Sequence, residues 1–249
     1  WRTGAREALH VGQDVAWALT RDGALAAQIP HRCTNRRVGS RQPLTTAEQA
    51  ALVDAAGHAG ATLVMLTETK SLDEAMAFHG MCDRFQFFCE PVYRTLISEL
   101  RWNRDEAETS RDGMDIATLE LSVADTAGLR MLSRWSIVKL LRGVGGGAIL
   151  EDMSRRAIRA ASALCLVRYP ETTPKAYFRG GQAMQRVWLT ATALGLAVQP
   201  LSVAPYLFAR LERGAGNGFT AQEQQTLREL RGRFAAVYGP TDRHAEVLL

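Results

Sequence analysis

Cysteine is scarce in this sequence, and its few cysteines lack the spacing of a metal site or of a disulfide framework. The four are Cys33, Cys82, Cys89 and Cys165. Zinc ligands and redox pairs follow CxxC-type spacings, and small secreted domains are dense in cysteine, so neither class of protein fits. We therefore expect reduced thiols, as in a cytoplasmic protein.

Long apolar segments are also missing. No apolar run reaches the roughly 18–20 residues that a bilayer-spanning helix needs. The first residues do not contain the apolar core of a secretory signal peptide. The sequence therefore predicts no membrane span and a cytoplasmic location.

Lysine is rare, so arginine carries most of the positive charge; the three lysines are Lys70, Lys139 and Lys175. The net charge is +4, and the arginines are spread along the chain, which argues against nucleic acid as a partner. Arginine suits bidentate recognition of phosphate or carboxylate. With 47% apolar and 22% charged residues in a chain of 249, the composition predicts a folded globular protein.

The motifs of several enzyme classes are absent. The five histidines show no HExxH-type spacing, so no metal site is expected. The glycine run at 143–147 lacks the Lys-Ser/Thr of a P-loop and is interpreted as a flexible linker. Cys33 lies near His31 in sequence, but this does not provide an oriented thiolate–base pair. Cys165 falls in an apolar segment and is interpreted as core.

Hydrophobic periodicity predicts an α+β domain in which helices outnumber strands. Capping-box pairs mark three helix starts; they are Thr45/Glu48, Ser71/Glu74 and Thr220/Glu223. Helices are expected within 1–30, after Thr45 as far as Gly57 or Gly60, and at 71–81, 93–102 and 182–194. Another is expected to start at Pro205, and a last one to run from the Thr220 cap to about Tyr238. Strands are expected at 61–67, 160–169, 196–201 and 246–249.

The chain reads as one domain covering residues 1–249. We find no internal repeat, low-complexity tract or linker rich in Pro, Gly and Ser. Residues 103–113 are charged and end in Asp112-Gly113, a turn signal, so a solvated loop is expected there. The chain begins with Trp1 and stops within an expected strand. We therefore expect it to be part of a longer protein, whose N-terminal portion and C-terminal tail are missing from this sequence.

Two local patterns are candidate sites. Arg32, Thr34 and Arg36 offer two guanidinium groups and a hydroxyl that a phosphate could accept from. The alternative is a solvated arginine run that pairs with acidic residues of neighbouring helices. Met184 and Trp188 could edge a cofactor from the 182–194 helix, although such a stripe at helical spacing also fits plain core.

Residues 180–201 (GGQAMQRVWLTATALGLAVQPL) and 31–37 (HRCTNRR) together resemble the FMN-dependent nitroreductase family, in its atypical branch that includes domains fused to ThiF-type adenylating domains. The resemblance implies a nitroreductase-like fold, with a central, mostly antiparallel sheet flanked by helices and one long core helix. It also implies a homodimer that binds FMN. Arg32, Thr34 and Arg36 would hold the FMN phosphate and ribityl chain. The backbone of Pro200, Leu201 and Ser202 would pass along the isoalloxazine ring.

The same resemblance implies an oxidoreductase in which NAD(P)H gives a hydride to the flavin. An electron-poor acceptor then takes the electrons, for example a nitro compound, a quinone or a modified peptide. The family's NSQPW segment, which helps recognise the flavin pyrimidine, is absent. One alternative is therefore a non-catalytic flavin-binding or scaffold module attached to an adenylating enzyme. Another is modification of a peptide or carrier-bound substrate beside such an enzyme, with residues 103–113 as a lid or docking surface.

Overall fold

The computed structural model describes residues 23–214, 216, 218–240 and 244–248. Most of the helical segment expected within residues 1–30 lies outside this part of the chain. The described portion of it contains a short helix α3 (Gly23–Ala26) and a 3₁₀ turn η2 (Ile29–His31).

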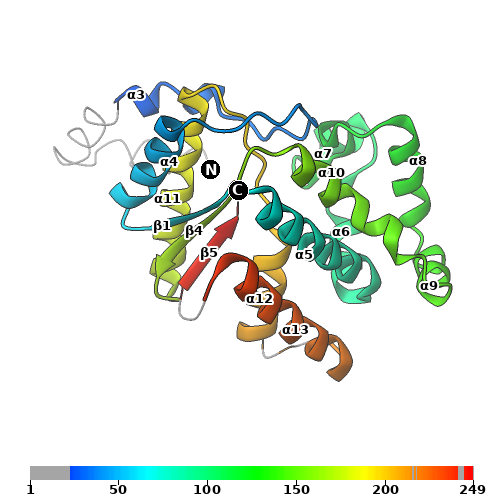
Figure 1. The fold of residues 1–249 in the computed structure, drawn as a ribbon. Helices are drawn as coiled ribbons and strands as arrows, with labels where there is room; N and C mark the ends of the chain where they lie inside the picture. The colour runs from blue at the N-terminus through cyan, green and yellow to red at the C-terminus, as the bar shows by residue number, and fades with distance from the viewer. Residues whose placement is uncertain (1–22, 215, 217, 241–243, 249) are drawn as a thin grey trace.

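A three-stranded antiparallel sheet forms the centre of the main part of the molecule (Figure 1). The strands are β1 (Thr62–Leu66), β4 (Leu164–Pro170) and β5 (His244–Leu248), in the order β1-β4-β5. The first four residues of β4 are all buried, as expected of a central strand with both faces covered. The predictions of strands at 61–67, 160–169 and 246–249 are confirmed with small shifts of their ends.

Helices cover both faces of this sheet. Helices α4 (Thr46–His58) and α11 (Pro174–Ala193) pack on one face, where Cys165 and Val167 of β4 join their core. Helices α5 (Thr69–Phe88), α12 (Val203–Arg213) and α13 (Ala221–Tyr238) pack on the other, where Leu166 joins a core containing Phe78 and Phe234. Because successive side chains of a strand point to opposite faces, the apolar run of β4 serves both cores.

Beyond α5 lies a mostly helical part, drawn in green in Figure 1. Its elements are α6 (Glu90–Ser98), β2 (Leu100–Arg101), α7 (Arg104–Ser110), β3 (Met114–Asp115), η3 (Ile116–Leu119), α8 (Val123–Leu132), α9 (Trp135–Gly143), η4 (Gly146–Glu151) and α10 (Asp152–Ala160). Strands β2 and β3 are parallel and only two residues long. The core of this part includes Phe87, Tyr93 and Leu129, so α5 contributes to the cores of both parts.

Two of the three predicted capping boxes are present. Thr45 caps α4 and Thr220 caps α13, and in each the glutamate at the third helical position bonds back to the cap. The third prediction is wrong, because α5 begins at Thr69 and continues to Phe88. Buried apolar residues recur along its whole length, so tertiary packing extends this helix in both directions beyond the predicted limits.

Other predictions also need correction. Helix α11 begins at Pro174 behind a Thr173 cap, so Gly180 lies inside the helix and does not precede it. Residues 103–113 form helix α7 and its flanks where we expected a solvated loop. The glycine run expected to be a linker leads into η4, where Gly147 is buried. Among the described residues no helix is long and apolar enough to cross a membrane.

Candidate functional site

The two segments singled out from the sequence lie side by side in the structure. Thr34 and Val198 form an isolated parallel bridge, and the amide of Asn35 donates to the carbonyl of Val198 at 2.9 Å. Gly195, at φ 73°, ends helix α11 and turns the chain back so that 196–201 can reach the arginine-rich segment. Residues 196–201 thus make one bridge to that segment and do not form the predicted strand.

A cavity of about 290 Å³ opens beside this bridge. Its walls come from the arginine-rich segment, the end of α10, the start of β4, helix α11 and the 196–201 segment. The lining residues are Asn35–Ser40, Leu44, Leu52, Ala157, Ile158, Ala160–Cys165, Val187, Ala191, Leu196–Gln199 and Leu201. We refer to it below as the Arg36 cavity.

Small and apolar side chains make up most of the Arg36 cavity. Its small residues are Gly39, Ala157, Ala160, Ala161, Ala163, Ala191 and Ala197. Leu164 and Val187, which are buried, add branched apolar side chains to the lining. Short side chains leave the space that a planar ring system needs, and the apolar wall gives such a ring a favourable surface to cover.

Two arginines give one side of the cavity a positive charge. Arg36 donates from Nη1 to the carbonyl of Thr118 at 3.2 Å, and its Nη2 lies 3.7 Å from the sulfur of Met114. The Nε of Arg37 lies 3.2 Å from a carboxylate oxygen of Glu120. Each guanidinium has further N–H groups that could donate to an anion.

Of the six residues predicted to bind a cofactor, two line this cavity, namely Arg36 and Leu201. Thr34 lies in the bridge beside it. The guanidinium of Arg32 stacks on the ring of Trp188, 4.3 Å from its centroid. Pro200 precedes Leu201, and Ser202 occupies the N-cap position of α12 without a side-chain cap bond. Arg32, Thr34, Pro200 and Ser202 are therefore neighbours of the cavity and do not line it.

Several lining residues escaped the sequence reasoning. Arg37 belongs to the same arginine run, but no local pattern marked it as a lining residue. Ser162 and Gln199 carried no sequence signal. Burial raises the pKa of the Cys165 thiol to about 12, so it stays protonated and is no nucleophile. Trp188 is 5% exposed and belongs to the core, which was one of the two alternatives for its helix stripe.

This chain is similar to the "Uncharacterized protein MT1398" of Mycobacterium tuberculosis (strain CDC 1551 / Oshkosh), to which it is 33% identical over 221 residues. The match covers 88% of this chain but only 30% of that protein. This chain thus spans under a third of the length of its relative. No family model matches the chain, and no solved structure matches it.

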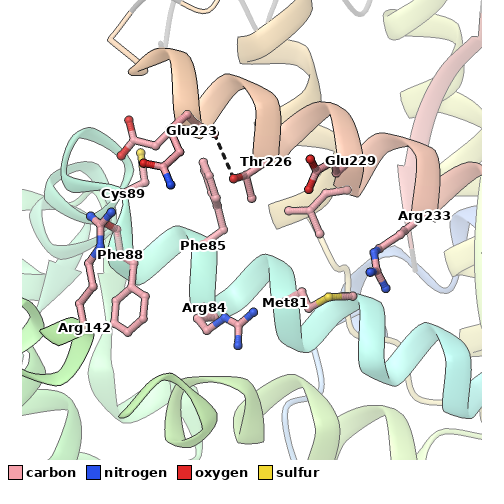
Figure 2. A pocket seen from close by; sticks show the side chains of 12 residues that line it. Met81, Arg84, Phe85, Phe88, Cys89, Arg142, Glu223, Thr226, Glu229 and Arg233 are labelled. Atoms are coloured by element: carbon pink, nitrogen blue, oxygen red, sulfur yellow. Dashed lines mark hydrogen bonds between the residues drawn. The ribbon is translucent and has the colours of Figure 1, made fainter. Parts of the chain in front are cut away.

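A second cavity of about 330 Å³ lies between α5, α9 and α13 (Figure 2). Met81, Phe85 and Phe88 form an apolar part, and charges of both signs surround it. Arg84 pairs with Glu151 at 2.8 Å, and Arg142 donates to the carbonyl of Phe88. The mixed charges favour no one class of ligand, so this cavity is the weaker candidate. Among the described residues no group of His, Cys, Asp and Glu could hold a metal ion.

Proposed function

We propose that this chain binds FMN in the Arg36 cavity and acts as a nitroreductase-like flavin oxidoreductase. One observation carries the proposal. The two segments that resemble the flavin-binding elements of that family, 31–37 and 196–201, are far apart in sequence, yet they meet at the Thr34–Val198 bridge and line one cavity together.

The residues of the cavity fit the chemistry of FMN. Small-molecule sites are mostly apolar with a few placed polar groups, and they measure about 300–1,000 Å³. At about 290 Å³ the Arg36 cavity lies at the lower limit of this range, and the ring system of FMN would occupy it. Arg36 and Arg37 would hold the phosphate, because a guanidinium pairs with its oxygens in a bidentate way. Leu201 and the alanines would contact the ring.

The bound flavin would supply the redox chemistry, and the protein would supply binding, orientation and electrostatics. The lining residues include no pair of acid and base, which suits a reaction that needs none from the protein. In the proposed reaction NAD(P)H is the electron donor. The electron acceptor is a nitro compound, a quinone or a modified peptide. We further propose a homodimer in the cytoplasm.

The first test is flavin binding by the purified protein. FMN is added, excess is removed, and the visible spectrum is recorded before and after anaerobic NADPH. We expect a retained flavin band that bleaches. The variant Arg36→Gln should bind FMN about tenfold more weakly or worse, because a hydrogen bond to a charged group is lost. Its affinity for riboflavin, which has no phosphate, should stay within about twofold of the wild type.

Arg104→Gln is the matched control for Arg36→Gln. Arg104 is 85% exposed on α7, pairs with Glu108 and does not line the cavity. It should leave the affinity for FMN unchanged. Absence of any retained flavin in the wild-type protein would refute the proposal.

A second candidate function is a flavin-binding or scaffold module without its own turnover, attached to a ThiF-type adenylating domain. The relative favours it in one respect, since 70% of that protein lies outside the matched region and offers room for other domains. Stoichiometric flavin that NADH and NADPH both fail to bleach would support this alternative over an oxidoreductase.

A further inference from the structure

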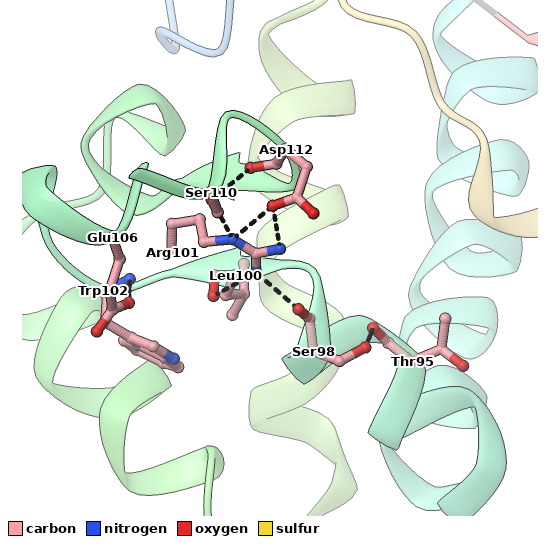
Figure 3. Close-up of polar contacts among 8 residues, drawn as sticks. All are labelled: Thr95, Ser98, Leu100, Arg101, Trp102, Glu106, Ser110 and Asp112. Carbon is pink, nitrogen blue, oxygen red and sulfur yellow. Dashed lines mark hydrogen bonds and ion pairs between the residues drawn. The ribbon is translucent and has the colours of Figure 1, made fainter. Parts of the chain in front are cut away.

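Residues 100–120, here named the 100–120 segment, present polar groups to the rim of the Arg36 cavity. The segment is held together by Arg101, whose side chain is 17% exposed (Figure 3). Arg101 donates to Asp112 at 2.6 Å, to Ser110 at 2.9 Å and to the carbonyl of Ser98 at 2.7 Å. These bonds from Arg101 lower the pKa of the Asp112 carboxyl, so the ion pair persists at neutral pH.

Hydrogen bonds and core packing also hold the C-terminal end of the 100–120 segment. The amide of Met114 donates to the carbonyl of Glu99 at 2.7 Å. Asp115 caps the 3₁₀ turn η3 by accepting from the amide of Ala117 at 2.9 Å. Ile116 and Leu119 pack against the core of the helical part. The carbonyl of Thr118 and the residue after the turn, Glu120, therefore have defined positions.

Glu120 has an unusual backbone conformation for its side chain. It ends η3 in the left-handed region, at φ 54°. A residue with a β-carbon pays roughly 1 kcal/mol or more to adopt this conformation, and glycine or asparagine is the common choice there. A glutamate at this position is therefore a reason to look for a role of its side chain. That side chain pairs with Arg37 at 3.2 Å.

Arg36 and Arg37 thus meet the 100–120 segment through two oxygens, the carbonyl of Thr118 and the carboxylate of Glu120. Both arginines also line the cavity. Any anion that binds them from the cavity side must share the arginines with these two oxygens. The carboxylate matters more than the carbonyl, because it is a full negative charge next to the site that would receive another.

We propose that Glu120 is a specificity-determining residue that competes with the anionic group of the ligand for Arg37. Its carboxylate lowers the affinity for a phosphorylated ligand, whose phosphate must displace it from Arg37, and it leaves the affinity for an unphosphorylated ligand unchanged. This inference rests on the proposed function in assigning the anion to the phosphate of FMN. The competition itself requires only that an anion reach Arg37.

The size of the effect follows from exposure. The side chain of Arg37 is 77% exposed and that of Glu120 is 41% exposed, so the ion pair is screened and its removal changes the affinity for an anion by about two- to fivefold. The effect should fall as ionic strength rises, because the Debye length is about 10 Å at 0.1 M salt.

The experiment compares Glu120→Gln with the wild type at low salt, by quenching of flavin fluorescence. We expect Glu120→Gln to bind FMN two- to fivefold more tightly and riboflavin equally well. Glu108→Gln is the matched control, because Glu108 lies in the same segment and pairs with Arg104, away from the cavity. It should leave both affinities unchanged. Equal FMN affinity for Glu120→Gln and the wild type, or an equal gain for riboflavin, would overturn the inference.

A second measurement needs no flavin site. Binding of inorganic pyrophosphate is measured by titration calorimetry for the wild type, Glu120→Gln and Arg37→Gln. We expect Glu120→Gln to tighten pyrophosphate binding and Arg37→Gln to weaken it. If pyrophosphate follows this order while FMN fails to bind, the proposed flavin function fails and the role of Glu120 stands. If Glu120→Gln leaves pyrophosphate binding unchanged or undetectable, the inference fails whatever FMN does.

Discussion

At the scale of single residues, the buried pair of His79 and Tyr238 makes the stability of the protein depend on pH. His79 Nε2 lies 2.8 Å from the hydroxyl of Tyr238, and both side chains are buried in the core between α5 and α13. Burial lowers the pKa of His79 to about 4, because the core does not solvate the imidazolium. The histidine is therefore neutral in the folded protein and titrates at its ordinary value when unfolded.

We predict that this histidine makes the protein less stable as the pH falls from about 6.5 towards 4. In that window the unfolded chain binds a proton that the folded chain rejects, so the free energy of unfolding decreases with decreasing pH. The full effect, reached near pH 4, is about 3 kcal/mol. Urea unfolding at pH 7.5, 6, 5 and 4 would follow it.

His79→Gln serves as the comparison, since glutamine does not titrate and can still bond to Tyr238. The difference in stability between the wild type and this variant should shift in favour of the variant as the pH falls. A difference that is constant between pH 7.5 and pH 5 would contradict the assignment of a neutral buried histidine.

At the scale of elements, the turn before β3 depends on a glycine. Gly113 has φ 66°, and a β-carbon there would lie 2.5 Å from the carbonyl oxygen of Glu99 and 2.6 Å from Arg101 Cζ. Gly113→Ala therefore combines an unfavourable backbone conformation with a steric clash against the residues that hold the 100–120 segment. We predict a loss of about 2 kcal/mol or more in the free energy of unfolding.

The matched substitution is Gly232→Ala within α13. A β-carbon at Gly232 would meet nothing within 4 Å, and alanine favours a helix interior over glycine. This variant should gain about 0.5–1 kcal/mol. Thermal and urea unfolding of both variants would give the comparison, and equal effects of the two substitutions would argue against the described geometry at Gly113.

The same scale shows what the sequence can and cannot predict. Helices with a capping box, such as those after Thr45 and Thr220, follow from local chemistry and were found at their true starts. Helix α7 was missed although Asn103 and Glu106 bond to each other in a reciprocal cap. The high charge of this segment predicts a loop, whereas the Asn103 cap indicates the helix that forms.

Other features depend on contacts between distant residues. The extension of α5 to Phe88 follows from tertiary packing, because Phe85 and Phe87 lie in two different cores. The family resemblance implies that segments 31–37 and 196–201 both lie against the flavin. No local pattern specifies the Thr34–Val198 bridge or predicts that Arg37 lines the cavity. The α+β class could be predicted from periodicity, and the arrangement around the candidate site could not.

At the scale of the whole molecule, α5 connects the two parts. Phe78 and Phe85 belong to the core that α5 forms with α12 and α13 on one face of the sheet. Phe87 belongs to the core of the helical part. A helix with buried side chains in both cores cannot unfold with only one of them. We therefore expect one cooperative unit over the described residues.

Glu246 of β5 offers a test of that cooperativity. It is buried, pairs with Arg231 at 2.7 Å, and burial raises the pKa of its carboxyl. Glu246→Ala leaves Arg231 with Glu212 as an ion-pair partner, so we expect a loss of about 2–3 kcal/mol, below the usual cost of breaking a buried pair. Glu246→Gln, which can still accept from Arg231, should lose less.

The unfolding of Glu246→Ala should be followed by circular dichroism and by tryptophan fluorescence. In a background where Trp1, Trp17 and Trp188 are replaced by phenylalanine, the remaining tryptophans, Trp102 and Trp135, pack in the helical part. If the molecule is one unit, both signals shift to the same lower denaturant midpoint. A fluorescence midpoint that stays at the wild-type value would show that the helical part unfolds independently.

The bridge at Thr34 and the hydrogen bond of Arg36 affect the order in which the molecule folds. In the arginine-rich segment, Thr34 forms a bridge with Val198, and Arg36 donates to the carbonyl of Thr118, which is 82 residues away. Contacts over such separations close large loops and form slowly relative to helices. Helices, whose contacts are local, can therefore form before the walls of the Arg36 cavity come together. During refolding, helical signal should return first, and the capacity to bind a ligand should be the last property the chain acquires.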